Sequence, residues 1–275
     1  MYKKNTKKST EPIKEDPMKQ ARACFLLVLA LSVSAVAQTA APEGFDRAMA
    51  LGDSLAEKWA HADAAAAYLK ALELYPASYD AAWKAGDETT EYAKKLPANE
   101  KAAKEAAFEK ARTLCEKAIA LNPKGWEGHF RLSVALGRLA LFRGGKQKIN
   151  LAKQVKAQVD TAVALNPHAD LAWHVIGRWH QDLANLNFAL KTVAKIIFGG
   201  VPPGSNDEAV AAFQKAISID PNHIEHHLEL ARTYKLMGKK ELMAAPLQKV
   251  LDLPSVEEDD DAFKAEAKEM LAKLK

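Results

Sequence analysis

A short apolar phrase ending in proline recurs along this chain and limits its fold more than any other feature. Four full copies and one shorter copy are present: ALELYP at 71–76, AIALNP at 118–123, AVALNP at 162–167, AISIDP at 216–221 and VLDLP at 250–254. Each copy is typical of the end of an amphipathic helix, because alanine and leucine favour helix and proline cannot continue it. A phrase repeated in this way predicts a series of stacked helical units.

The units resemble tetratricopeptide repeats, which are 34-residue helix–turn–helix motifs. With Phe45 at position 1, the first unit fits the motif without a gap, since Gly52 lies at position 8, Tyr68 at position 24 and Pro76 at position 32. The motif places small residues where its two helices approach closely and an aromatic side chain beside them. The resemblance therefore implies close helix pairs along the whole array.

The later units are longer than the motif. Successive prolines lie 47, 44, 54 and 33 residues apart, and the extra residues fall between the two helices of repeats two, three and four. We expect long second helices over about 100–121, with Asn99 as the N-cap, and over about 146–165, after two glycines. In repeat four, the apolar stretch 188–198 predicts an inserted helix, which is either buried or in contact with lipid. Ser205 and Glu208 then form a capping-box pattern.

The C-terminal residues predict a helix that caps the array. An acidic run at 257–261 precedes a segment whose apolar residues recur with helical spacing: Phe263, Ala267, Met270, Leu271 and Leu274. Negative charge at the start of a helix suits its dipole. Such a helix shields the last repeat from water.

Two stretches carry a resemblance to one particular family. They are WHVIGRW at 173–179 and AKIIFGGVPP at 194–203, followed by the repeat ending at 221. Together with the long second helices, they resemble the regulator of microtubule dynamics family over roughly residues 45–275, most strongly over 160–275. The resemblance implies a tetratricopeptide superhelix with a binding role. Because of the leader described next, we expect a bacterial, exported member of this family.

The first residues predict export. A cationic start at 18–22, an apolar run at 23–33 and an Ala-Val-Ala ending before Gln38 form the three parts of a secretory signal peptide. The apolar run is shorter than the ~20 residues that span a bilayer as a helix. We therefore expect an upstream extension, a true start at Met18, cleavage before Gln38, and a mature chain in the periplasm without a transmembrane segment.

Charge and cysteine content exclude other classes of protein. The chain has a formal net charge of +4, and residues 1–37 carry the whole excess with seven basic and three acidic residues. The remainder is neutral, so composition gives no reason to expect nucleic acid as a partner. Cys115 is the one cysteine after the leader, and we expect it to be a small buried core residue.

The candidate binding surface is the concave groove formed by the first helices of stacked repeats. Its expected residues run from an acidic and aromatic end to a basic end: Asp80, Trp83, Asp87, Phe130, His174, Arg178, Gln181, Arg232 and Lys235. Arg178 and Arg232 occupy the same position of neighbouring repeats. Two adjacent guanidinium groups suit a carboxylate or phosphate. The alternative is that each pairs with a nearby acid and supports the fold.

No catalytic or metal-binding pattern is found in the sequence. It contains no nucleotide-binding glycine loop, no Gly-x-Ser-x-Gly and no His-Glu-x-x-His. His223, His226 and His227 lie close in sequence, but no other ligands complete a metal site, so we expect surface or groove histidines. The chain is therefore not expected to be an enzyme or to hold a cofactor.

These observations predict an all-α chain in which about five helix pairs form an α/α superhelix with a C-terminal cap. The expected organisation is a leader at 1–37, a linker at 38–44 and one domain at 45–275, with repeats at 45–78, 79–125, 126–169, 170–223 and 224–256 and the cap at 257–275. The expected function is a non-catalytic scaffold that holds a protein or peptide of unknown identity in its groove. The alternative is a carrier of lipid or another small molecule in an apolar groove.

Overall fold

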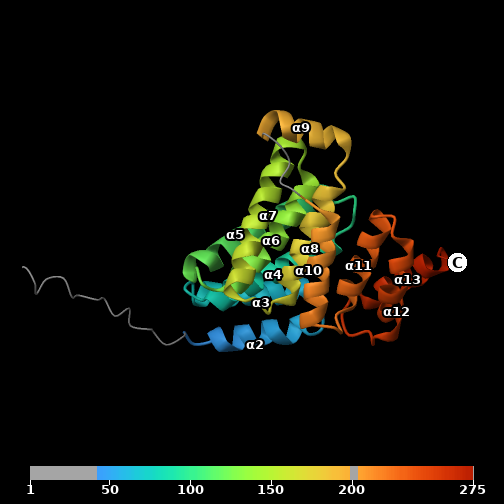
Figure 1. Ribbon diagram of the computed structural model, residues 1–275. Helices are drawn as coiled ribbons and strands as arrows, with labels where there is room; N and C mark the ends of the chain where they lie inside the picture. Colours follow the sequence, from blue (N-terminus) through green and yellow to red (C-terminus); the bar gives the residue numbers. More distant parts are fainter. Residues whose placement is uncertain (1–41, 199–203, 275) are drawn as a thin grey trace, which may run out of the picture. The chain divides into compact units, whose positions relative to one another are not determined.

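The computed structural model describes residues 42–198 and 204–274, which contain helices and no strand (Figure 1). The leader expected over 1–37 lies outside the described residues. Five helices stand first in their pairs: α2 (Phe45–Ala56), α4 (Tyr79–Lys95), α6 (Trp126–Leu139), α8 (Asp170–Ala184) and α11 (Ile224–Leu236). Their partners are α3 (His61–Leu74), α5 (Lys101–Leu121), α7 (Gly145–Leu165), α10 (Asn206–Ile219) and α12 (Ala244–Asp252). Helix α9 (Phe188–Phe198) stands between α8 and α10, and α13 (Asp260–Ala272) follows the last pair. The expected all-α class is confirmed.

The first helices form a continuous row. Helix α4 packs against α6, α6 against α8, α8 against α11, and α11 against the terminal helix α13. Each second helix packs against its own partner and against the first helix of the next pair. We call the side of the first helices that the second helices leave uncovered the inner face.

The recurring phrase ends its helices through the residue before proline. The side chains of Asn122, Asn166 and Asp220 each accept a hydrogen bond from the backbone N–H two residues later, at 2.9–3.1 Å. All three have extended backbone angles, which the following proline favours. The side chain thus forms a turn across a proline that has no N–H of its own. This local chemistry explains why three copies of the phrase end in Asn-Pro or Asp-Pro.

A second recurring contact joins the start of the next helix to the turn before it. Nitrogen atoms of His129, Trp173 and His227, all at position 4 of their repeats, lie 2.9–3.1 Å from the carbonyl oxygen of the proline that precedes their helix. A donor at this position satisfies a carbonyl group exposed by the turn. The sequence alone does not reveal that a ring N–H donor recurs at position 4, because histidine and tryptophan share little else and are not usually grouped as one residue type.

The close approach of paired helices is as the motif predicts. A Cβ added to Gly52 would lie 2.5 Å from the Tyr68 ring, and one added to Gly177 would lie 2.6 Å from the Phe213 ring. Tyr68 and Phe213 are both buried. In repeat two the same approach is filled by Cys115, which is fully buried as expected.

The insertions take the form of longer second helices and one additional helix. Helix α5 begins at Lys101 after Glu100, and Asn99 is not the N-cap, so that assignment is wrong. The Ser205 hydroxyl does accept the N–H groups of Asp207 and Glu208 at the start of α10. Helix α9 lies across one end of α7 (Figure 1). Its Phe188 and Ile196 side chains are 84% and 78% exposed, so the simple expectation of a buried helix is wrong for these residues.

The last helix has the apolar side predicted for a cap. Ala267 and Met270 are buried in one cluster with Leu228 and Leu247, and Phe263 packs against them. Across the described ranges, every helix is too short or too polar to cross a lipid bilayer.

Candidate functional site

Charged pairs join successive first helices along the inner face, and we call this series the ion-pair ladder. Each pair links position 9 of one repeat to position 6 of the next, and the last pair reaches the terminal helix. The pairs are Asp53–Lys84 at 2.5 Å, Asp87–Arg131 at 2.8 Å, Arg178–Glu229 and Arg232–Glu266. The position 9 charges that were candidates for a partner are therefore engaged within the array.

The order of charge reverses along the ion-pair ladder. In the first two pairs the acid comes from the upstream repeat, and in the last two the base does. Between them, Val134 and Val175 occupy the same two positions and belong to one apolar cluster. A slip by one repeat would place Asp87 against Val175 and leave its carboxylate unpaired. The ladder therefore favours this order of repeats.

Glu229 is the most heavily engaged member of the ladder. Its side chain is fully buried and pairs with the guanidinium groups of both Arg178 and Arg232. Gln181 donates to Glu229 at 3.1 Å and to the Thr233 hydroxyl at 2.9 Å. The two adjacent arginines thus bind a carboxylate of their own chain, which is the supporting role left open by the sequence.

The structure corrects the expected placement of three groove residues. Phe130 is 3% exposed, Gln181 is 5% exposed and His174 is 7% exposed, so none of them lines an open surface. Phe130 stacks on Trp126 with ring centroids 6.1 Å apart. The face of a helix that packs against its neighbours is wider than the motif alone suggests, and it includes these positions.

Asp87 combines a buried position with a charged partner. Its side chain is only 16% exposed, and burial raises its pKa to about 6, although the guanidinium group of Arg131 acts in the opposite direction. The ionised form therefore depends on this ion pair.

Other predicted residues remain accessible on the inner face. Asp80 is exposed and accepts a hydrogen bond from the Trp83 indole at 3.0 Å, while Trp83 is partly exposed. Lys235 is exposed near the end of α11. Position 2 of the five first helices forms an accessible and largely acidic row: Asp46, Asp80, Glu127, Leu171 and Glu225. A partner on the inner face would meet this row.

A histidine pair bridges helices α8 and α11. His174 Nδ1 lies 2.9 Å from His226 Nδ1, and His226 Nε2 lies 3.0 Å from a carboxylate oxygen of Asp170. The carboxylate accepts, so His226 donates through Nε2 and accepts at Nδ1 from His174. His226 and His227 are buried, so the expectation of surface or groove histidines is wrong for both. Within the described ranges, no three histidine, cysteine or acidic side chains are arranged to hold a metal ion.

The histidine pair predicts a loss of stability in acid. Burial lowers the pKa of His174 well below its usual 6.5, and burial also lowers the pKa of His226 despite Asp170. As the pH drops below about 6.5, the unfolded chain becomes protonated at these sites while the folded chain is still neutral there. The free energy of unfolding therefore decreases as the pH decreases. We expect the fall from about pH 7.5 to 5.5 to be smaller in His174→Gln, measured by urea unfolding. His168→Gln, at an exposed histidine, serves as the control. An unchanged pH dependence in His174→Gln would refute this role.

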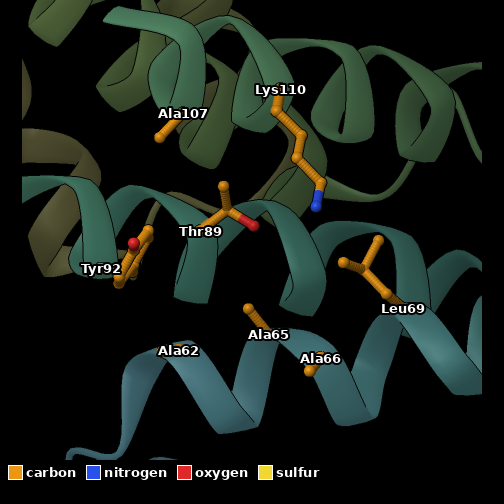
Figure 2. A pocket seen from close by; sticks show the side chains of 8 residues that line it. All are labelled: Ala62, Ala65, Ala66, Leu69, Thr89, Tyr92, Ala107 and Lys110. Atoms are coloured by element: carbon orange, nitrogen blue, oxygen red, sulfur yellow. The ribbon is translucent and has the colours of Figure 1, made fainter. Parts of the chain in front are cut away.

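A small apolar pocket lies between α3, α4 and α5 (Figure 2). Its volume is about 240 Å³. The lining residues are Ala62, Ala65, Ala66, Leu69, Thr89, Tyr92, Ala107 and Lys110. Pockets for drug-sized ligands usually enclose roughly 300–1,000 Å³, so this one suits a single small apolar group. It involves the second helices α3 and α5, and it includes none of the residues predicted from the sequence.

Comparison with known proteins places the chain in a family. The family model for regulator of microtubule dynamics protein 1–3 matches residues 48–275. The chain belongs to the regulator of microtubule dynamics protein 1–3 family. The bovine regulator of microtubule dynamics protein 1 is 30% identical over 158 residues, which are 57% of this chain and 50% of the relative. The mouse protein 2 is 30% identical over 166 residues, or 60% and 40% of the two chains.

The chain therefore spans about half the length or less of these curated relatives. Among solved structures, a thermophilic tetratricopeptide-repeat protein of Thermus thermophilus, TTC0263, superposes with a TM-score of 0.61 at 17% identity. The match covers 82% of this chain and 98% of that protein. This likeness shows the fold, and the expected resemblance to tetratricopeptide repeats and to this family is confirmed.

Proposed function

We propose that this member of the family is a non-catalytic scaffold that holds a protein or an extended peptide on its inner face. The observation that carries the proposal is the uninterrupted row of first helices. Ion pairs of the ladder join neighbouring first helices except α6 and α8, whose contact is apolar, while the position 2 row and Trp83 stay accessible. Stacked repeats use such extended surfaces for binding. Cofactors and nucleic acid have no part in this proposal.

Affinity capture from the envelope fraction of the protein's own cells tests this function. Asp182→Lys with Leu236→Glu changes two exposed side chains at position 13 of α8 and α11, one helical turn after the position 9 arginines of the ion-pair ladder and so on the same side of each helix. We expect this variant to lose most of the captured partner. The control variant makes the same two types of change on second helices, as Glu73→Lys with Leu165→Glu. Equal capture by the two variants, or no captured protein at all, would oppose the proposal.

We also infer that the mature chain acts in the cell envelope. The support is the leader pattern that ends before Gln38. The intact mass of protein purified from the envelope fraction tests this, because cleavage leaves a chain that begins at Gln38. An uncleaved chain recovered from the cytoplasm would contradict it.

A second candidate function is a lipid or small-molecule carrier. The observation that favours it is the exposure of Phe188 and Ile196 on α9, which carries Lys191 and Lys195 and no acidic residue. Native mass spectrometry of gently purified protein tests this function. A lipid carrier is expected to show a mass that includes a bound lipid. A clean mass of the protein alone would exclude it.

A further inference from the structure

The segment before the terminal helix returns to the first two repeats. The carboxylate of Glu258 lies 2.8 Å from the Lys95 ammonium group and 3.2 Å from His61 Nε2. Asp259 lies 2.9 Å from Lys95 and 3.9 Å from Lys94. The contacts join residues more than 160 positions apart in the chain. We call residues 257–259 the acidic loop.

The acidic loop is held in shape by its own chain. The carboxylate of Asp260, which is 2% exposed, accepts the backbone N–H groups of Val256 and Glu257, each at 2.8 Å. These bonds fix the turn independently of the lysines. Glu258 and Asp259 are thus presented as two consecutive carboxylates on a turn directly before α13.

The groups that receive the acidic loop are basic side chains from two helices. Lys94 and Lys95 lie in the last turn of α4, and His61 is the first residue of α3. Hydrogen bonding from Lys95 lowers the pKa of Asp259 most, and the positive charges of Lys94 and Arg138 on α6 lower it further. The facing acids on the same elements are Glu88, which lies 2.8 Å from His61 Nδ1, and Glu91, which pairs with Lys94.

The contact between the acidic loop and Lys95 is weak enough for another ligand to replace the loop. Side chains of Lys95, Glu258 and Asp259 are 31–40% exposed. Ion pairs at this exposure are weak and screened by salt. The acidic loop nevertheless occupies the site effectively, because it belongs to the same chain as the lysines and so has a high effective concentration there. An external acidic peptide must therefore compete with the chain's own loop.

We propose that Lys94, Lys95 and His61 form a docking site for an acidic segment of a partner protein, and that Glu258 and Asp259 occupy this site until the partner displaces them. This inference rests on the proposed scaffold function and names the chemistry of one part of its partner. The acidic loop shows which ligand the site accepts, namely two consecutive carboxylates on a short peptide turn.

A labelled synthetic peptide that copies residues 254–262 (PSVEEDDDA) tests the proposal by fluorescence anisotropy. We compare the full chain with Glu258→Gln/Asp259→Asn, in which the internal loop no longer competes. The variant is expected to bind the peptide roughly tenfold more tightly than the wild type. The difference should disappear when salt is raised from about 50 to about 500 mM. Glu257→Gln/Asp261→Asn, which removes the same charge without touching the lysines, should behave as the wild type.

Two further variants decide where the peptide binds. Adding Lys94→Gln/Lys95→Gln to the Glu258→Gln/Asp259→Asn background should abolish binding. Adding Lys239→Gln/Lys240→Gln, at lysines distant in sequence, should leave it intact. Equal peptide affinity of the wild type and the loop variant, or binding that survives loss of Lys94 and Lys95, would overturn the proposal. Those results would leave the capture experiment above unaffected, because a partner can still bind the inner face.

Discussion

Replacing Glu229 with alanine is expected to lower the free energy of unfolding by about 3 kcal/mol. The Glu229 carboxylate is fully buried, and it is shared by Arg178 and Arg232 across two repeats. Its loss leaves two positively charged guanidinium groups close together without the negative charge that bridges them. It also removes one acceptor of the buried Gln181 amide. Urea unfolding followed by circular dichroism measures the effect.

The control for this prediction is Glu241→Ala, at an exposed acidic residue outside the ion-pair ladder. Surface changes of this kind usually alter stability by less than about 0.5 kcal/mol. Arg178→Ala, which removes one of the two bases and leaves Arg232 in place, should cost less than Glu229→Ala. If Glu229→Ala unfolds at the same urea concentration as the control, the ladder does not hold the repeats together.

Replacing Phe213 with alanine is expected to be the most destabilising single change, by about 4 kcal/mol. The ring is fully buried between α8 and α10, against the backbone of Gly177 and 5.3 Å from the His174 ring centroid. Truncation leaves a cavity, since packed helices relax only in part. Thermal and urea unfolding measure the loss, and Phe188→Ala, at an 84% exposed ring, is the control.

A double-mutant cycle tests the contact between Gly177 and Phe213 directly. Gly177→Ala alone should destabilise the fold, because its Cβ would lie 2.6 Å from the ring. In the Phe213→Ala background the same change should cost much less, because the ring is gone. Strictly additive effects would show that the two residues do not constrain one another.

Much of the fold is predictable because the repeat fixes it locally. The Asn-Pro and Asp-Pro endings, the glycines at position 8 and the aromatic residues at position 24 each act within one or two helices. The α9 insertion is recognisable as a helix, but its exposure is not. An apolar stretch does not reveal whether neighbouring segments cover it.

The inner face is less predictable, since its chemistry depends on contacts between repeats. The sequence singles out Arg178 and Arg232 through their shared position, yet their common partner Glu229 lies at position 6, which the motif does not assign to the groove. The alternation of charge between position 9 and position 6 of the next repeat is a usable signal for the ladder. The contacts of the acidic loop with Lys95 have no such signal in the sequence, because they join segments that are far apart along the chain and follow no repeat spacing.

Cross-linking from defined positions tests the central claim, that the inner face binds protein, most directly. A photoreactive residue is placed at Leu171, on the position 2 row of α8, or at Ala120, an exposed position on the second helix α5. Both proteins are irradiated in the envelope fraction, and the cross-linked products are identified by mass spectrometry. We expect a discrete protein adduct from Leu171 and none from Ala120. An adduct formed equally from both positions, or from Ala120 alone, would contradict the claim.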